Sequence, residues 1–204
     1  MTREMDKDMF EEYEGFPVRI GQMVPDMELN AYHKDKEMKV SLSDYKNKWL
    51  ILFFYPADFT FICPTELEDM ADLYAQFQKE GAEILSVSTD TVYTHKAWHD
   101  TSEAIKKIKF PMISDRNQSL SYMMGAIEEE SGNALRGTFV INPDGKLQMM
   151  ELNDNDSVGR NAKELLRKLQ GAKFAREHKG RVCPAKWEPG DDTLKPGLDL
   201  VGKI

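Results

Sequence analysis

Two apolar runs with an amphipathic stretch between them form the clearest pattern in the chain. Residues 51–55 (ILFFY) are continuously apolar and end at Pro56, which is typical of a strand buried on both faces. A second run rich in apolar residues spans 83–88, and apolar side chains recur at helical spacing over 65–79. Strand, helix and strand in this order predict a βαβ unit with parallel strands.

Weaker patterns predict that the sheet continues beyond this unit. Charged residues at 34–37 between two short β-like runs indicate an edge hairpin, and Asn-Pro-Asp-Gly at 142–145 suits a type I turn between two strands. The other predicted elements are a helix over 93–107, a short strand over 110–114, a short helix over 118–124, strands over 137–141 and 146–152, and a helix over 161–177. The predicted fold class is α/β, with a central mixed sheet flanked by helices.

Both ends of the chain lack this periodicity. The first residues are charged and rich in methionine, and the last ones are dense in glycine, proline and aspartate. We therefore expect three parts: an N-terminal arm at 1–17, one domain at 18–178, and a C-terminal tail at 179–204 that lies on a surface.

Composition and charge narrow the classes of function. Of 204 residues, 41% are hydrophobic, which is enough for the core of one domain. The formal net charge of −8 argues against binding to nucleic acid or to an anionic membrane surface. No apolar run approaches the roughly 20 residues of a membrane helix, and the N-terminus contains no apolar signal-peptide region. We expect a cytoplasmic protein.

The chain has two cysteines, Cys63 and Cys183, far apart in the sequence. A chain without a secretion signal is expected to keep its thiols reduced, so a catalytic role for the pair is favoured over a structural disulfide. Their separation excludes a C-x-x-C motif and a zinc site built from four cysteines. We expect neither a metal nor a cofactor.

Cys63 stands where the predicted strand at 51–55 leads into the helix at 65–79. Pro64 suits the first turn of a helix, because its missing N–H would have no partner there. The positive end of the helix dipole at this position favours a thiolate over a thiol. Thr60, three residues earlier, offers a hydroxyl donor on the same approach to the helix.

The segment FFYPADFTFICPTELEDM closely resembles the peroxidatic-cysteine motif of the peroxiredoxins, which are thiol peroxidases of thioredoxin-like fold. The chain looks most like their typical two-cysteine class, of the alkyl hydroperoxide reductase C type. The resemblance extends through SVSTDTVYTHKAWHD, KFPMISD, LRGTFVINPDG, VCPAKWEPG and the closing LDLVGKI, and so covers nearly everything from about residue 20 onward. It implies the thioredoxin-like fold of the peroxiredoxin type.

The resemblance also implies a role for each matching residue around the predicted nucleophile. Cys63 would attack a peroxide and become a sulfenic acid, while Thr60 and Arg136 hold the peroxide and Pro56 shields the sulfur from water. Arg136 would also be the partner of the Cys63 thiolate. Glu66 either favours the helix N-terminus or orients Arg136 through an ion pair, and both roles are compatible.

Two further residues follow from the resemblance. Trp98 would lie beside the site and pack there, because an indole offers only an N–H and an apolar face. Cys183 would condense with the sulfenic acid of Cys63 to form a disulfide between the two subunits of a homodimer. Because the sulfenic acid must leave a closed pocket, we expect the first helical turn and the tail to unfold locally.

The expected partners also come from the resemblance. The substrates would be hydrogen peroxide and organic hydroperoxides, and the dimers would assemble into a decamer. The reductase would be a flavoprotein, the alkyl hydroperoxide reductase F component, or a thioredoxin-like dithiol protein, and the sequence does not decide between them. The chain lacks the Gly-Gly-Leu-Gly insertion and the Tyr-Phe extension of peroxide-sensitive members, so we expect resistance to overoxidation.

Other interpretations rank below a peroxidase. A general thiol-disulfide oxidoreductase would share the fold but should contain the C-x-x-C motif that this sequence lacks. A ring-forming holdase chaperone would need no cysteine. His95 is a candidate base or peroxide-pocket group, although a lone histidine in a helical stretch more often packs or faces water.

Overall fold

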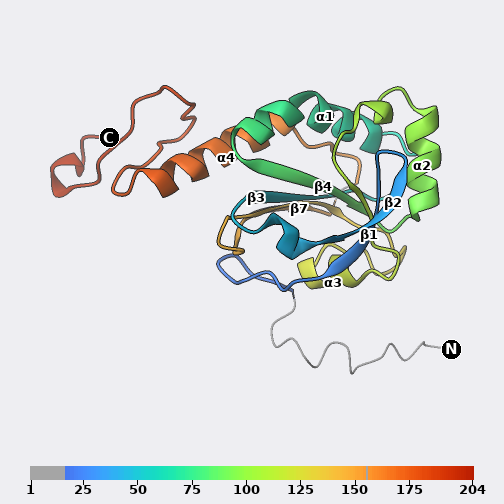
Figure 1. Cartoon of the computed structure of the whole chain (residues 1–204). Helices are drawn as coiled ribbons and strands as arrows, with labels where there is room; N and C mark the ends of the chain where they lie inside the picture. Colours follow the sequence, from blue (N-terminus) through green and yellow to red (C-terminus); the bar gives the residue numbers. More distant parts are fainter. Residues whose placement is uncertain (1–16, 155) are drawn as a thin grey trace.

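A seven-stranded mixed sheet forms the centre of the fold (Figure 1), as predicted. The computed structural model describes residues 17–154 and 156–204, so the predicted arm lies, apart from Pro17, outside the described residues. The strands are β1 Glu28–His33, β2 Lys36–Ser41, β3 Trp49–Phe54, β4 Ala82–Ser88, β5 Met112–Ser114, β6 Arg136–Ile141 and β7 Leu147–Asn153. Their order across the sheet is β2-β1-β5-β4-β3-β6-β7.

Helices cover both faces of this sheet (Figure 1). The α-helices are α1 Cys63–Lys79, α2 Val92–Thr101, α3 Ser119–Met124 and α4 Ala162–Glu177. The 3₁₀ helices in the described part of the chain are η2 Leu42–Tyr45, η3 Ile105–Lys107 and η4 Leu198–Leu200. Side chains of α1, α2 and α4 belong to the hydrophobic cluster on one face, and side chains of α3 belong to the cluster on the other.

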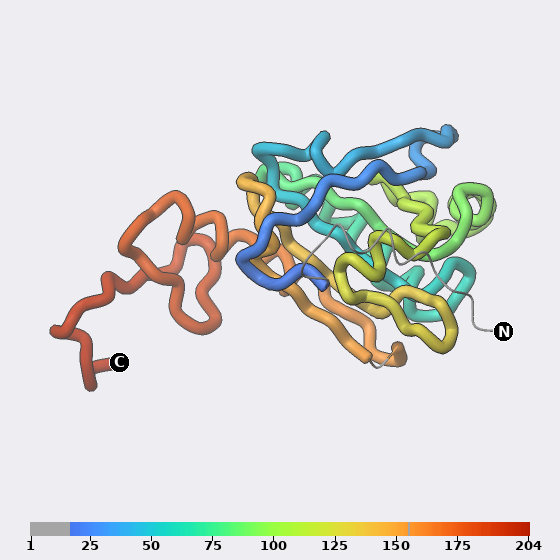
Figure 2. Tube along the Cα trace, turned by 90° about the horizontal axis from the view of Figure 1, so that it is seen from below, coloured from blue at the N-terminus to red at the C-terminus, as the bar shows by residue number. Residues whose placement is uncertain are grey.

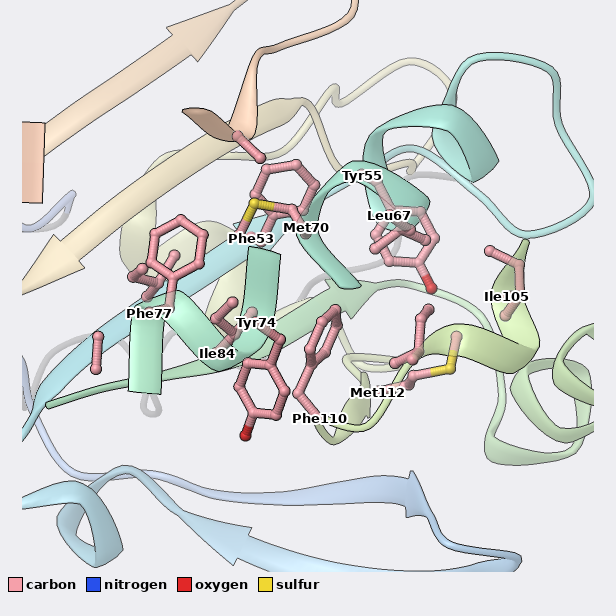
Figure 3. Packing of buried hydrophobic residues seen from close by; sticks show 14 of the residues in the cluster. Phe53, Tyr55, Leu67, Met70, Tyr74, Phe77, Ile84, Ile105, Phe110 and Met112 are labelled. Carbon is pink, nitrogen blue, oxygen red and sulfur yellow. The ribbon is translucent and has the colours of Figure 1, made fainter. Parts of the chain in front are cut away.

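Strand β3 is buried on both faces because it lies between these two clusters. Trp49, Ile51 and Phe53 point into the cluster under α1, and Leu50, Leu52 and Phe54 point into the opposite one. Figure 3 shows Phe53 packed with Met70 and Phe77 of α1. Complete burial of side chains of this size contributes about 2 kcal/mol each. The continuous apolar run in the sequence is thus explained by its central place in the sheet.

The predicted βαβ unit is confirmed. Strand β3 pairs in parallel with β4, with Phe53 opposite Ser86, and α1 forms the connection between them. On its other side β3 pairs antiparallel with β6. The carboxyl end of β3 therefore lies beside the amino-terminal end of β6, and this juxtaposition creates the site described below.

The two predicted hairpins are also confirmed, and each turn contains backbone in the left-handed region. Lys34 and Asp35 (φ 49° and 60°) connect β1 to β2, as a two-residue turn of twisted strands requires. Gly145 (φ 84°) ends the turn between β6 and β7. Strands β2 and β7 are the two edges of the sheet.

The predicted helix over 93–107 is wrong in its second half. Helix α2 ends at Thr101, and Ser102 adopts an extended conformation (φ −105°, ψ 122°) before η3 begins. The Ser102 amide still donates to the Trp98 carbonyl, while its hydroxyl accepts from the Ile105 amide at 3.5 Å. A serine that bonds its own neighbours in this way competes with the helix, which apolar spacing alone does not reveal.

The segment after α4 leads away from the sheet (Figures 1 and 2). It contains η4 and an isolated bridge between Val182 and Leu194. Its main anchor is Trp187, which is buried against Phe174 of α4 at 5.2 Å between ring centroids. No helix in the described part of the chain is long and apolar enough to cross a membrane.

Helix α4 begins where the sequence predicts, and its start yields a stability prediction. The Asn161 side chain accepts a hydrogen bond from the Glu164 amide at 3.0 Å. Replacing Asn161→Ala should lower the free energy of unfolding by about 1 kcal/mol, while Asn161→Ser should lose less than half of that. Urea unfolding of the three proteins measures this. Equal losses in both variants would contradict the capping role.

Candidate active site

Cys63 is the first residue of α1, and its side chain is completely buried. Ile62 is the cap residue before it, and Pro64 lies in the first turn. The amides of Thr65 and Glu66 both donate to the Ile62 carbonyl, at 3.0 and 3.2 Å. The predicted position of the cysteine at the helix start is therefore what the structure has.

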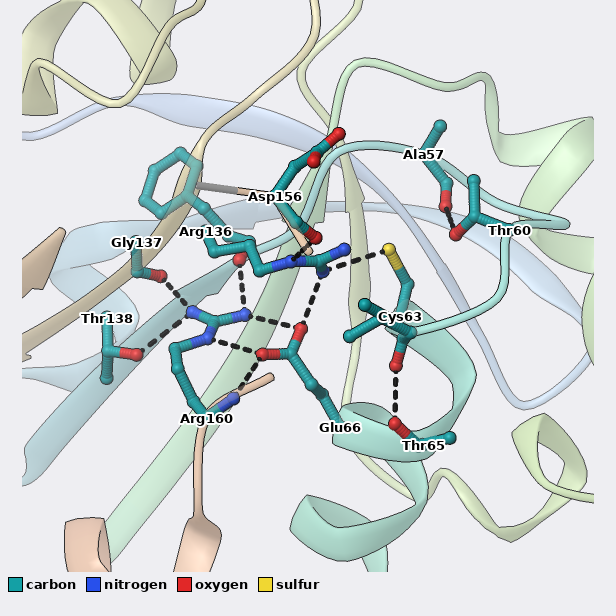
Figure 4. A network of polar contacts seen from close by, with 12 residues as sticks. Ala57, Thr60, Cys63, Thr65, Glu66, Arg136, Gly137, Thr138, Asp156 and Arg160 are labelled. Atoms are coloured by element: carbon teal, nitrogen blue, oxygen red, sulfur yellow. Dashed lines mark hydrogen bonds and ion pairs between the residues drawn. The ribbon is translucent and has the colours of Figure 1, made fainter. Parts of the chain in front are cut away.

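Arg136 contacts the sulfur directly (Figure 4). Its Nη1 donates to Cys63 Sγ at 3.3 Å and to Glu66 Oε2 at 2.8 Å, and its Nε donates to the Asp156 carbonyl at 2.7 Å. Arg136 begins β6, and its side chain is only 4% exposed. The antiparallel pairing of β6 with β3 brings it to the end of β3, from which the chain leads to Cys63.

Arg160 is a second buried arginine on the same carboxylate, and no local sequence pattern predicts it. Its backbone amide and Nε donate to Glu66 Oε1 at 2.7 and 2.9 Å, and its Nη2 donates to Oε2 at 3.0 Å. Further bonds reach the carbonyls of Phe54 and Gly137, and the guanidinium lies 3.7 Å from the centre of the Phe53 ring. These contacts tie the start of α4 to α1 and to the sheet.

The two arginines shape the electrostatics of the site. Burial alone would raise the pKa of Glu66, but the hydrogen bonds and charge of Arg160, together with the charge of Arg136, lower it below its ordinary value. Burial lowers the pKa of Arg136, and the neighbouring Cys63 sulfur and Glu66 carboxylate outweigh this and raise it. The lowered pKa keeps Glu66 a carboxylate at neutral pH, and arginine side chains are always charged in proteins.

The loop between β3 and α1 contains the other predicted residues. Thr60 is half-buried, and its hydroxyl donates to the Ala57 carbonyl at 2.9 Å rather than toward the sulfur. Pro56 is half-buried directly after β3. Trp98 of α2 is buried, with its ring 6.1 Å from that of Tyr55 and 5.9 Å from that of Phe59, measured between centroids. The indole thus packs on the loop from its side.

Cys183 lies far from Cys63 within one chain. Its thiol is 3.9 Å from the Gly171 carbonyl, and the preceding Gln170 bonds Glu80 at the far end of α1. The 17 residues of α1 separate Cys63, at the start of the helix, from Glu80, directly after its end; the rise along the helix is roughly 25 Å. Burial raises the pKa of the Cys183 thiol, and the charge of Arg167 opposes this. The two thiols are not brought together here.

A metal site does not emerge from the geometry. Over residues 17–154 and 156–204, no group of three His, Cys, Asp or Glu side chains is arranged to hold an ion.

Two family profiles match the chain. The profile of the AhpC/TSA family matches residues 20–150, and that of the C-terminal domain of 1-Cys peroxiredoxin matches residues 171–201. The second match includes Cys183, so this chain has a second cysteine within the segment that resembles the 1-Cys peroxiredoxin domain.

Individual relatives agree with these profiles. Alkyl hydroperoxide reductase C of Staphylococcus epidermidis is 52% identical over 171 residues, which cover 84% of this chain and 90% of the relative. The crystal structure of Enterococcus faecalis AhpC has a TM-score of 0.79 at 47% identity, covering 82% of this chain and 99% of that one. The reduced 2-Cys peroxiredoxin of Plasmodium vivax has a TM-score of 0.84 at 31% identity, covering 90% and 96%.

A family profile matched over more than half of the sequence, and a relative 52% identical over most of it, show that this chain belongs to the AhpC/TSA family and is a peroxiredoxin.

Proposed function

We propose that Cys63 is the nucleophile and Cys183 the resolving thiol of this enzyme. Its membership of the AhpC/TSA family and its likeness to alkyl hydroperoxide reductase C make it a thiol-dependent peroxidase that reduces hydroperoxides. The assignment of steps to residues is our proposal, and the charge balance around Cys63 is the observation that supports it most strongly.

Four buried side chains set this charge balance. Arg136 and Arg160 contribute two positive charges and Glu66 one negative charge, and all three side chains are at most 5% exposed. A net positive charge in a buried site is unfavourable unless it is compensated. A thiolate at Cys63, 3.3 Å from Arg136 Nη1, makes the cluster neutral. The site thus stabilises the nucleophilic form of the cysteine.

The first step follows from this arrangement. The Cys63 thiolate attacks the terminal oxygen of a hydroperoxide, the O–O bond breaks, and the departing alkoxide takes a proton to leave as an alcohol, or as water from hydrogen peroxide. The sulfur is oxidised by two electrons to a sulfenic acid. Arg136 stabilises the charge on the departing oxygen. Thr60 assists when its hydroxyl turns from the Ala57 carbonyl, and Pro56 shields the sulfur.

The second step joins the two cysteines. The Cys183 thiol condenses with the sulfenic acid, which forms the S–S bond and releases water. The roughly 25 Å rise of α1 between the two sites exceeds the 5.5–6 Å that typically separates the Cα atoms of a disulfide. We therefore propose that the reacting Cys183 belongs to a partner subunit. Because Cys63 is completely buried, its loop and the first turn of α1 must open for the reaction.

The remaining partners complete the proposed cycle. Members of this family act on peroxide together with a reductase, which returns the disulfide to two thiols. We propose that this reductase is the flavoprotein F component or a thioredoxin-like dithiol protein. The proposal also includes dimers that assemble into a decamer, a cytoplasmic location, and a division into an arm at 1–17, a peroxidase domain at 18–178 and a tail at 179–204.

A non-reducing denaturing gel tests the disulfide. One equivalent of hydrogen peroxide should convert the reduced wild-type protein to a covalent dimer, while Cys63→Ser and Cys183→Ser should each remain monomeric. A mixture of the two variants should form a covalent heterodimer, because each supplies the thiol that the other lacks. Peroxide consumption with monomeric products only would contradict a disulfide between subunits, and no peroxide consumption would contradict the role of Cys63.

The charge cluster also predicts how stability depends on pH. A lowered pKa of Glu66 stabilises the fold above the ordinary glutamate pKa of 4.5, and this contribution is lost as the pH falls through the lower native value. At pH 7, Glu66→Gln should reduce the free energy of unfolding by about 3 kcal/mol, because it leaves two buried cations less compensated. The difference from wild type should shrink as the pH falls below 4.5 and on through the lower native pKa. Urea unfolding measures both; a difference independent of pH would contradict the role of the carboxylate.

A further inference from the structure

A second buried polar cluster begins in the loop that leads to Cys63. Asp58 of this loop and His95 of α2 have fully buried side chains, and His95 Nδ1 lies 2.7 Å from Asp58 Oδ2. The other ring nitrogen, Nε2, lies 3.1 Å from the Ile113 carbonyl of β5. Tyr55, directly after β3, donates its hydroxyl to Asp58 Oδ1 at 2.8 Å. Asp58 is thus the point at which the loop is joined to α2 and β5.

Both nitrogens of His95 face atoms that accept hydrogen bonds. A carbonyl oxygen has no hydrogen to donate, so Nε2 carries one, and the bond from Nδ1 to Asp58 contains a second, shared hydrogen. His95 therefore has no lone pair free to act as a base toward peroxide. Asp90, in the turn before α2, is a further acidic residue beside the cluster: its carboxylate accepts from the Asp58 amide at 2.8 Å, and its charge raises the pKa of Asp58.

The free-energy cost of breaking this cluster favours two states of the loop, closed with the cluster intact and open with the cluster broken. Burial raises the pKa of Asp58, and the hydrogen bond and charge of His95 oppose this, so the carboxylate depends on its partner. If the Asp58 side chain moved out while His95 stayed buried, both residues would lose the hydrogen bond between them. The loop is therefore held by a cluster that is either intact or broken, rather than by many weak contacts.

Strain in the next residue opposes this hold. Phe59 has a φ of 56°, in the left-handed region that a phenylalanine rarely adopts, and its side chain is 55% exposed. Such a conformation is energetically unfavourable for a phenylalanine and persists only where the surroundings enforce it. Asp58, the residue directly before it, is fixed by its bonds to Tyr55, His95 and Asp90, and opening of the loop would allow Phe59 to leave this conformation.

We propose that Tyr55, Asp58 and His95 form a buried latch that holds the loop 56–62 closed around Cys63 and sets how often it opens for disulfide formation. They are positioning residues, because none of them contacts the sulfur. The inference rests on the proposed two-step function. The latch should therefore act mainly on the second step, which needs the open loop. When the closed form dominates, weakening the latch multiplies the small open population but leaves the closed population nearly unchanged.

Variants at Asp58 test the latch by separating the two steps. Asp58→Ala breaks it and should accelerate conversion of the sulfenic acid to the disulfide by roughly tenfold, with peroxide consumption in the first turnover changed less than about twofold. Asp58→Asn should stay within about twofold of wild type in both steps. Its oxygen accepts from Tyr55, and its amide donates to Nδ1 of a neutral His95, so every bond is kept. Rapid mixing with one equivalent of peroxide, an alkylating quench and a non-reducing gel measure both steps.

If Asp58→Ala does not fold, two Tyr→Phe variants, each of which removes one hydroxyl, test the latch instead. Tyr55→Phe removes one hydroxyl bond to a carboxylate and should accelerate disulfide formation by about fivefold. Tyr74→Phe removes the equivalent bond to Glu83, at 2.6 Å in the middle of α1, and should not change the rate.

The outcomes separate this inference from the proposed function. The latch would be overturned if wild type formed the disulfide while Asp58→Ala and Tyr55→Phe formed it at the same rate or more slowly. It would also be overturned if Tyr55→Phe and Tyr74→Phe accelerated disulfide formation equally. Slowing of both steps by the same factor would indicate a merely structural role and would also overturn it. If wild type formed no disulfide at all, the proposed function would fail instead.

Discussion

The hydrogen bond from Arg136 to the Cys63 sulfur is the interaction on which the rest of the site depends. It exists because β6 runs antiparallel to β3, so that the residue opening β6 meets the helix that follows β3. Glu66, one turn into α1, shares the same guanidinium nitrogen and fixes its direction. Arg160 then compensates Glu66 and connects the start of α4 to the same point.

This arrangement combines a rigid part with a movable one. The arginines and Glu66 are bonded to the sheet, to the carbonyls that follow it and to each other, so their charges are preorganised around the sulfur. The loop before Cys63 is held instead by one buried cluster at Asp58, and the strained backbone of Phe59 opposes that hold. The proposed cycle needs both, because the site closes around a small oxidant and then exposes its sulfenic acid to a distant thiol.

The sequence predicted those parts of the fold that depend on local patterns. The buried run at 51–55, Pro64 in the first turn and the Asn-Pro-Asp-Gly turn each lie where the structure has β3, the start of α1 and the turn between β6 and β7. Arg160 and the His95–Asp58 pair escaped because their partners lie far away in the sequence, and an isolated arginine or histidine has no local signature. The break of α2 at Ser102 depends on a side-chain bond that apolar spacing does not report.

The rate of peroxide reduction by variants of Arg136 tests the central claim most directly, that a fixed positive charge at the sulfur activates Cys63. At pH 7, Arg136→Gln should slow the reaction of the reduced protein with hydrogen peroxide by roughly a hundredfold, because the buried charge is lost. Arg136→Lys, which keeps the charge but loses the planar fork, should be slowed less. A rate for folded Arg136→Gln within about threefold of wild type would contradict the account.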